Sequence, residues 1–286
     1  MSESFDAHWL ALREPFDHAA RHAGLAGQLV AALPKVPWLV DLGAGTGSLF
    51  RYLAPLIGGD QSWTLIDADA ELLDEAFNAI GAWAIAHDWE IDPGEDTMRI
   101  NTPGGEWQLD GELHDLAAMP GDLPFREADA VVCSALLDIV SRGWLMALAE
   151  NVRQPFYAAL SVDGRDVWRP PHPADRIVRA GFRRDQARDK GFGRALGPDA
   201  ASVALRAFAA RGFAVASAPS DWVIPGKALI MSQELALGHA DAAQATMPAQ
   251  AGRIADWLAA RRRQSLRGRL AIRIGHRDIL ALPPKG

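Results

Sequence analysis

The sequence is poor in cysteine, because Cys133 is the only one among 286 residues. A single cysteine cannot close an internal disulfide, and it cannot furnish a cysteine-based zinc site. Residues 1–20 hold no basic segment followed by an apolar run, as a secretory signal would, and no uninterrupted apolar stretch reaches the roughly 18 residues of a membrane span. We therefore expect a cytoplasmic protein with no membrane span.

Linkers and internal repeats are also missing, so we expect a single domain over residues 1–286. Apolar residues make up 49% of the chain and charged residues 23%. This composition excludes a disordered chain, and it includes enough apolar side chains to form a large hydrophobic core.

Charge is unevenly distributed along the chain. Residues 1–160 hold 8 Lys and Arg against 25 Asp and Glu, whereas residues 161–286 hold 21 against 11, so net charges of −17 and +10 make up the overall −7. Such asymmetry can mark a binding surface. The simpler explanation, which we favour, is that the two parts attract each other within the fold and that most charges are solvated.

Strand and helix patterns alternate along most of the sequence, which is typical of an α/β sheet covered on both faces by crossover helices. The predicted strands lie at 36–43, 62–67, 128–135, 155–162, 212–219 and 269–282, with a hairpin over 97–116. Helical patterns fall between them, at 48–57, 68–86, 136–152, 198–210 and within 227–265.

Four segments make up the predicted domain. A helical cap over 1–34, broken near Pro15, precedes a cofactor-binding core over 35–162. The Pro- and Arg-rich residues 163–200 are too long for an ordinary connection and are predicted to form an insertion or lid. Residues 201–286 complete the sheet and its covering helices.

The strongest chemical signal is the segment VDLGAGTGSLF, which places Asp41, Gly43, Gly45 and Gly47 where a strand meets a helix. Glycines there remove side chains where the backbone must approach a ligand. Asp67 ends the next strand, where a carboxylate can accept hydrogen bonds from both hydroxyls of a ribose. The alternating glycines depart from the G-x-G-x-x-G fingerprint, which disfavours NAD.

These motifs resemble those of class I S-adenosylmethionine (SAM) dependent methyltransferases, whose first motif reads acid-x-Gly-x-Gly-x-Gly and whose second strand ends in an acid. The resemblance covers residues 36–162. It implies a Rossmann-like, three-layer fold with a seven-stranded sheet, parallel except for one reversed strand, and S-adenosyl-L-methionine as cofactor. The residues that it assigns to the cofactor are Asp41, Gly43, Ala44, Gly45, Gly47, Asp67, Ala68, Asp115, Leu116 and Ser134.

Within that set, the resemblance implies that the loop from Gly43 to Gly47 passes under the methionine portion and that Asp67 holds the ribose. Asp115 and Leu116 fall where the family contacts adenine, although an acid before an apolar residue is also common at strand ends. Ser134 can lie at the lip of the pocket or merely cap the next helix. Cys133 fits a small buried hydrophobe better than a nucleophile.

Methyl transfer from a sulfonium is an in-line displacement, so alignment and exclusion of water are the main tasks of the enzyme. A catalytic base is not obligatory, and no Ser-His-Asp arrangement or set of metal ligands is visible. After the fourth strand the sequence reads CSALLD, and not the Asn/Asp-Pro-Pro-aromatic motif of enzymes that methylate bases or amides. We therefore leave the catalytic residues open, predict no metal, and expect a small-molecule acceptor.

Candidate acceptor contacts lie in the N-terminal helices, after the fourth strand, in the fifth strand and in the insertion; they are Arg13, Asp138, Tyr157, Arg165 and Lys190. Arg13, Asp17 and Arg21 can form one polar stripe that faces the cofactor mouth if Pro15 only kinks the helix, or simply a solvated face. Tyr157 can equally be core. As a set, the cationic side chains of the insertion, which include Arg165 and Lys190, suit an acceptor that carries a carboxylate or phosphate group.

Three alternatives remain. A SAM pocket without a recognisable acceptor motif can belong to a SAM-consuming cyclase or lyase, or to a binding protein without activity. The basic segment RRRQSLRGRL suggests an RNA or protein methyltransferase as a further alternative. However, no aromatic residues lie between its arginines, and the acidic residues 1–160 would repel phosphates. Nucleic acid is therefore disfavoured as a partner, while a monomer and a homodimer remain equally open.

Overall fold

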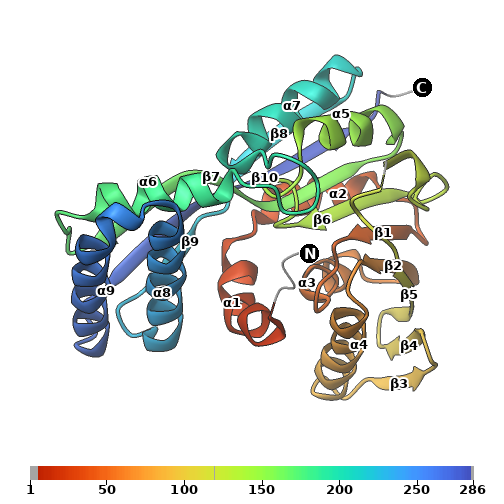
Figure 1. Ribbon diagram of the computed structural model, residues 1–286. Coiled ribbons are helices and arrows are strands. Elements are labelled where there is room, and N and C mark those ends of the chain that lie inside the picture. The colour runs from red at the N-terminus through yellow and green to blue at the C-terminus, as the bar shows by residue number, and fades with distance from the viewer. Residues whose placement is uncertain (1–5, 119, 285–286) are drawn as a thin grey trace.

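The computed structural model describes residues 6–118 and 120–284. Its centre is a ten-stranded sheet with helices on both faces (Figure 1). Seven strands form the core of this sheet in the spatial order β5 (Gly105–Leu113), β2 (Gln61–Asp67), β1 (Trp38–Leu42), β6 (Ala130–Ser134), β7 (Phe156–Arg169), β10 (Ala271–Leu282) and β8 (Ala214–Pro219). β5, β2, β1, β6 and β7 pair in parallel, and β10 runs antiparallel to both its neighbours. The prediction of a mostly parallel seven-stranded core with one reversed strand is confirmed.

Three short strands extend this core. The predicted hairpin is present as β4 (Thr97–Thr102) and β5, and β3 (Glu90–Pro93) adds an antiparallel edge strand beyond it. β9 (Trp222–Ile224) pairs with the first part of β10. We predicted neither β3 nor β9, because each is too short to show an alternating pattern.

Helices fill the connections between strands. They are α1 (Ala7–Ala20), α2 (Ala23–Ala32), α3 (Ser48–Ile57), α4 (Ala70–Ile85), α5 (Arg142–Asn151), α6 (Asp175–Gln186), α7 (Ala200–Ala210), α8 (Leu229–Thr246) and α9 (Ala251–Leu266). Short 3-10 turns stand at 120–122, 197–199 and 248–250. None of the helices in the described ranges is both long and apolar enough to cross a membrane.

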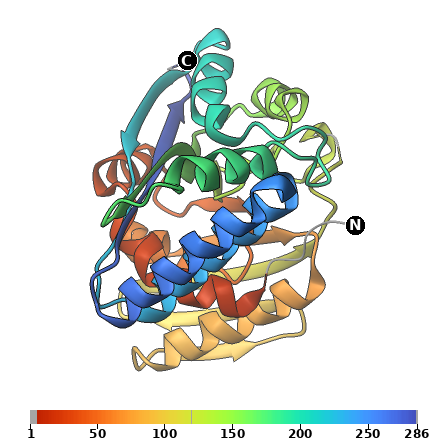
Figure 2. The same cartoon turned by 60° about the vertical axis from the view of Figure 1, so that its left-hand side comes forward.

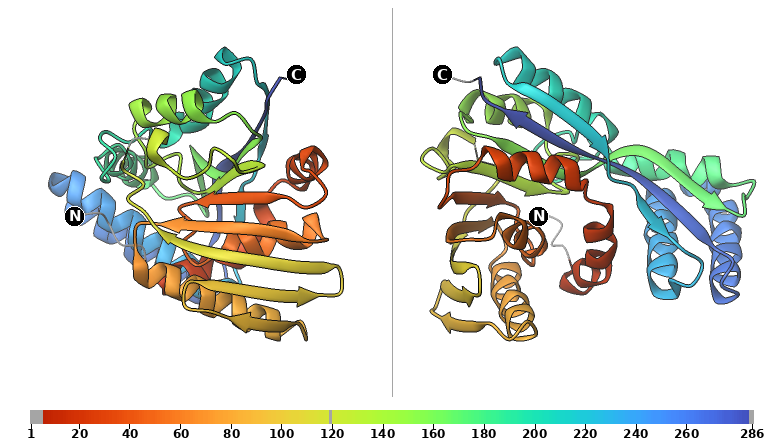
Figure 3. Two further views of the ribbon diagram at one scale, coloured as in Figure 1. Left: turned by 90° about the vertical axis from the view of Figure 1, so that its right-hand side faces the viewer. Right: turned by 180° about the vertical axis from the view of Figure 1, so that it is seen from behind.

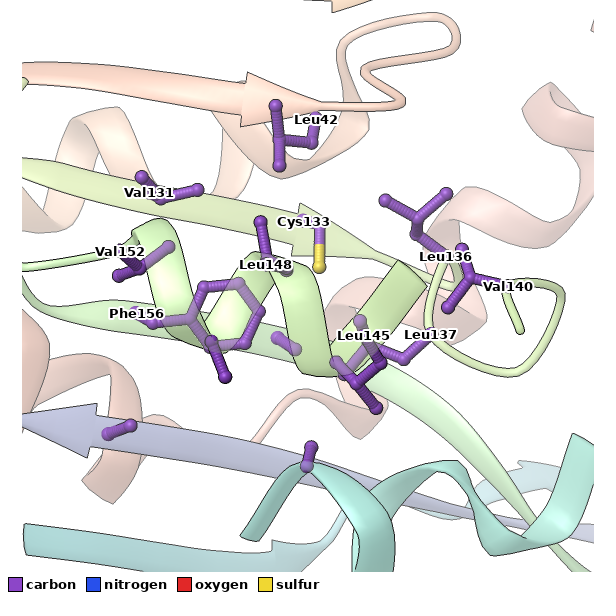
Figure 4. Packing of buried hydrophobic residues seen from close by; sticks show 14 of the residues in the cluster. Leu42, Val131, Cys133, Leu136, Leu137, Val140, Leu145, Leu148, Val152 and Phe156 are labelled. Atoms are coloured by element: carbon purple, nitrogen blue, oxygen red, sulfur yellow. The ribbon is translucent and has the colours of Figure 1, made fainter. Parts of the chain in front are cut away.

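The two faces of the sheet bury alternate residues of each strand. Leu39 and Val132 face α2, α3 and α4, whereas Val40 and Cys133 face α5 and α7. Figure 4 shows Cys133 of β6 in the hydrophobic cluster on the α5 and α7 face of the sheet, among leucines from α5 and from the loop before it. Burial raises the pKa of the Cys133 thiol well above its ordinary value, which makes it a structural side chain and not a nucleophile.

Besides the two clusters of buried hydrophobic residues on the faces of the sheet, a third cluster lies away from the sheet centre. β7 and β10 continue past the core as a long ribbon, to which β9 adds a short third strand, and α6, α8 and α9 pack together along it (Figures 2 and 3). Trp168 of β7 and Trp257 of α9 are buried in this arm, and their rings meet edge to face at 4.9 Å. Trp9, Leu12 and Phe16 of α1 pack against the same cluster, so α1 bridges the arm and the core.

Two segments differ from the prediction made from the sequence. The first helix runs through Pro15, and the break comes at Arg21 and His22, where the N–H of His22 donates to the buried carboxylate of Asp278 at 2.7 Å. The insertion over 163–200 begins as strand, since β7 extends to Arg169, and it contains α6 before an irregular stretch at 187–196.

Asp278 of β10 is fully buried and joins three distant parts of the chain. Its carboxylate accepts hydrogen bonds from the His22 N–H, from the Tyr157 hydroxyl at 2.8 Å and from the Leu160 N–H at 2.9 Å. Tyr157 is therefore held in the core. Leu160 lies at an irregularity of β7 with a left-handed φ of 58°, which the Asp278 contact stabilises.

Replacing Asp278 with alanine should lower the free energy of unfolding by about 3 kcal/mol, because three buried donors lose a charged acceptor at once. Urea denaturation followed by circular dichroism measures the change. Asp92→Ala, at an exposed position in β3, is the matched control and should cost less than about 0.5 kcal/mol. A loss below about 1 kcal/mol at position 278 would contradict this account of the α1–α2 break.

Candidate active site

The loop between β1 and α3 has the backbone that its glycines allow. Gly43, Gly45 and Gly47 have left-handed φ values of 71°, 53° and 75°. A Cβ on Gly47 would lie 2.7 Å from the side chain of Ile80, and one on Gly45 would lie 3.3 Å from that of Leu10. The loop therefore needs glycine for its conformation, and at Gly47 also for space.

Asp67, at the end of β2, holds this loop in place. One carboxylate oxygen accepts the Gly45 N–H at 2.8 Å and the other accepts the Asp69 N–H at 3.2 Å. Burial raises the pKa of Asp67, while these backbone donors oppose the rise. A carboxylate can accept further hydrogen bonds, and Asp67 lines the adjoining cavity, so it can order the loop and accept from a ligand hydroxyl.

A cavity opens at the carboxyl ends of β1, β2 and β6, and we call it the glycine-loop cavity. Seven of the predicted cofactor contacts line it: Gly43, Gly45, Asp67, Ala68, Asp115, Leu116 and Ser134. Leu72, Ile139 and Phe192 add apolar wall, and Lys190 stands beside Phe192 in the irregular stretch of the insertion. The carboxyl edge of a parallel sheet is where ligands bind in open α/β folds.

A smaller cavity, which we call the Asp41 cavity, adjoins the first beneath the glycine loop; Asp41, Ala44, Arg21 and Ser134 are among its lining. Both carboxylate oxygens of Asp41 are buried and have no hydrogen-bond partner within the described ranges. Burial raises the pKa of Asp41 to about 7, with Arg21 opposing the rise and Asp67 adding to it. A buried carboxyl in this state is suited to a cationic ligand group.

Arg21 supplies the opposite charge in the Asp41 cavity. Its guanidinium donates to the Ser48 carbonyl, the Ser48 hydroxyl and the Ser134 hydroxyl, each at 3.2 Å. The remaining Nε–H is buried and finds no acceptor among the residues described. The sequence placed Arg21 in a stripe that can face the cofactor mouth if the helix continues past Pro15, as it does, but did not assign Arg21 to the cofactor.

A third cavity, the Trp222 cavity, lies between α1, the ends of β6 and β7, and the arm. Three of the predicted acceptor contacts, Arg13, Asp138 and Arg165, line it, whereas Lys190 lines the glycine-loop cavity. Tyr157 lines none of the three cavities described here, and neither does Gly47, which begins α3.

Two titratable groups in the Trp222 cavity lack partners. Oδ1 of Asp138 and Nδ1 of His276 are buried, and neither contacts a polar atom in the part of the chain that the structure describes. Burial raises the pKa of Asp138 to about 7, opposed by Arg13. Burial and Arg13 lower the pKa of His276 to about 4, although Asp17, Asp163 and Asp221 oppose this, so its ring is neutral near pH 7.

The three cavities meet at one point. Arg13 of α1 and Ala135, directly after β6, line all of them. Ala135 has a left-handed φ of 53°, a conformation that costs a non-glycine residue free energy and that concentrates at functional sites. No group of three or more His, Cys, Asp or Glu in the described residues could hold a metal ion.

No family model and no curated protein sequence matches this chain. Solved structures do match. A SAM-dependent methyltransferase from Geobacter sulfurreducens in complex with S-adenosyl-L-homocysteine is 16% identical, with a TM-score of 0.42 over 96% of this chain and 98% of that one. A putative sarcosine dimethylglycine methyltransferase from Galdieria sulphuraria is 13% identical, with a TM-score of 0.44 over 98% and 86%. The cyclase SpnF is 14% identical, with a TM-score of 0.43 over 100% and 87%.

Proposed function

We propose that this protein is a SAM-dependent methyltransferase that acts on a small molecule. The observation that supports it most directly is the Asp41 cavity, where a buried carboxylate and a buried guanidinium N–H both lack partners in the described part of the chain. An α-amino acid end, with one ammonium and one carboxylate, satisfies both groups at once. The methionine portion of SAM has such an end.

The other half of the site fits the nucleoside portion. Asp67 can accept from the ribose hydroxyls while it continues to hold Gly45. Leu72, Leu116 and Phe192 supply apolar surface for an adenine ring, and the Leu116 carbonyl is held in place by the Trp144 indole N–H at 2.7 Å. When bound, SAM would supply an electrophilic methyl group. The residues of the chain bind it, orient it and exclude water.

Arg13 and Ala135 mark where a cofactor and an acceptor would meet, since they border all three cavities. Arg13 is held by Asp17 at 3.0 Å, and its guanidinium lies 4.8 Å from the ring centre of Trp222. This fixed arrangement suits an in-line reaction, because small errors of alignment cost much of the rate.

The surroundings of Arg261 favour a small molecule over RNA, whereas the other four arginines of the basic segment are exposed. Arg261, part of the basic segment near the C-terminal end, is fully buried and pairs with Asp175, and it also donates to the Pro170 carbonyl at 2.6 Å. This arginine therefore stabilises the arm and presents no charge to phosphates. The three cavities are adjoining pockets that open partly to solvent, and not a groove along a basic face.

Incubation of the purified protein with SAM and a pool of small-molecule acceptors, followed by mass spectrometry of the nucleosides, tests the proposal. The expected product is S-adenosylhomocysteine, formed only when acceptor is present. Methylthioadenosine would instead indicate a cyclase or lyase, and bound but unchanged SAM would indicate a binding protein without activity. A sample that neither retains nor converts SAM would overturn the proposal.

A further inference from the structure

The Trp222 cavity has the properties of a binding site for an uncharged, flat molecule. Its wall includes the rings of Trp9, Trp222 and Phe182 and the side chains of Leu160 and Ile274. These rings are fixed in place. Trp222 donates its indole N–H to Asp17 at 2.8 Å and meets Trp9 edge to face at 6.2 Å. Rigid aromatic walls favour ring-shaped ligands at little cost in entropy.

Three of the four arginines that line this cavity are paired with carboxylates, and the fourth, Arg183, contacts a backbone carbonyl. Arg13 pairs with Asp17 at 3.0 Å and Arg165 pairs with Asp221 at 2.7 Å. Arg179 pairs with Asp166, and Arg183 donates to the Gly164 carbonyl at 2.6 Å. A carboxylate or phosphate on the ligand would have to compete with these partners. The anionic acceptor predicted from the sequence is therefore not favoured at this site.

Two polar atoms remain for the ligand. His276 is 3% exposed, its ring lies 4.8 Å from that of Trp222, and its Nδ1 has no partner within residues 6–118 and 120–284. Oδ1 of Asp138, in the loop between β6 and α5, is also buried and without a hydrogen-bond partner in these ranges. Buried polar atoms without partners are rare in proteins, and here two of them border one cavity.

We propose that the Trp222 cavity binds the methyl acceptor, that this acceptor is an uncharged aromatic compound with a hydroxyl group, and that Asp138 accepts the hydrogen bond of that hydroxyl. This inference rests on the proposed function. His276 lines the same cavity and contacts a second polar group of the ligand. Arg13 and Ala135 then lie between the acceptor and the cofactor.

Asp138 also gives the hydroxyl proton a destination. As the acceptor oxygen bonds to the methyl carbon, its O–H bond breaks and the proton passes to the Asp138 carboxylate, while the electron pair of the broken C–S bond stays on sulfur. Atoms and charge balance without any further reactant. Because burial brings the pKa of Asp138 close to neutrality, the carboxylate can take up this proton and release it to solvent afterwards.

Isothermal titration calorimetry on the full chain tests the inference with matched probes. Phenol, 2-naphthol and 7-hydroxycoumarin are compared with benzoate and 2-naphthoate. We expect at least one hydroxyarene to bind, and at least tenfold more tightly than its matched carboxylate. Asp138→Leu should weaken that binding tenfold or more and leave the affinity for SAM within threefold. Asp256→Leu, at an exposed position on α9, is the control and should change neither affinity.

Asp138→Asn separates binding from proton transfer, because the amide oxygen still accepts a hydrogen bond but cannot take the proton. Binding should stay within threefold of wild type, whereas methylation of a bound hydroxyarene should fall at least 100-fold. The inference is overturned if SAM binds but no hydroxyarene does, if the carboxylates bind more tightly, or if Asp138→Leu has no effect. Failure of SAM to bind would count against the proposed function alone, since hydroxyarene binding is measured without SAM.

Discussion

Gly45→Val should abolish the binding of SAM. Gly45 has a left-handed φ of 53°, its N–H donates to Asp67, and a Cβ there would lie 3.3 Å from Leu10 at the wall of the glycine-loop cavity. Valine branches at Cβ and disfavours this backbone conformation, so the loop has to move. The movement breaks the contact with Asp67 and fills space that the ligand needs. We expect a loss of affinity of at least 100-fold in equilibrium titration.

A second glycine variant separates loss of the site from loss of stability. Gly212, between α7 and β8, has a left-handed φ of 85°, but a Cβ there would meet nothing within 4 Å. Gly212→Val should therefore lower the free energy of unfolding by roughly 1–2 kcal/mol, as backbone strain requires, and leave SAM affinity unchanged. If both variants bound SAM like wild type, or lost it equally, the glycine loop would not be the cofactor site.

Asp41→Asn should have opposite effects on stability and on binding. The folded pKa of Asp41 is about 7, above the 3.8 of a free aspartate, so between these values the folded chain holds a proton that the unfolded chain has released. Stability contributed by this group is complete below about pH 4 and falls as the pH rises to about 7. Removing the acid should raise the free energy of unfolding at pH 8 by roughly 1–3 kcal/mol and leave it unchanged at pH 4.

Binding should respond in the other direction. The asparagine side chain has no charge for the ammonium group of SAM, and a buried charged hydrogen bond contributes roughly 1.5–3 kcal/mol, so affinity at pH 8 should fall about 10- to 100-fold. Urea unfolding at pH 4 and pH 8, with SAM titration at pH 8, measures both effects. Arg21, Asp67 and Cys133 interact electrostatically with Asp41 and remain unchanged. Asp92→Asn, at an exposed site, should alter neither quantity.

A variant that became less stable at pH 8 would show that Asp41 is a structural acid with an internal partner. A variant that became more stable but bound SAM normally would place the methionine end elsewhere. Only the combination of higher stability and weaker binding agrees with a carboxylate kept for a ligand.

The sequence was sufficient to predict the sheet core because its signals are local. Apolar runs ended by glycine or aspartate locate β1 and β2, and the alternation with helices implies a sheet covered on both faces. Elements that depend on distant contacts were not predictable in this way. The first helix passes Pro15 and ends where Asp278, more than 250 residues away, accepts the His22 N–H. The outer half of β7 exists because β10 pairs with it.

The residues of the candidate site likewise fall into those that a local sequence motif predicts and those that only the folded chain brings together. Asp41, Gly43, Gly45 and Asp67 form a sequence motif, so their proximity follows from the first two strands. His276 was missed, and Arg21 was not assigned to the cofactor, because only the folded chain brings these residues to the cavities. The spacing of charged residues along the sequence also cannot show which of them form ion pairs in the folded chain. Arg165 appeared as a free cation in the sequence, and the structure pairs it with Asp163 and Asp221.

Titration of SAM into the purified protein at pH 7.5, with NAD as the comparison ligand, decides whether the glycine loop holds SAM. We expect saturable binding of one SAM molecule per chain, at least 100-fold tighter than that of NAD, and its loss in Gly45→Val. Absence of SAM binding by the wild-type protein, or NAD binding of equal strength, would contradict this assignment.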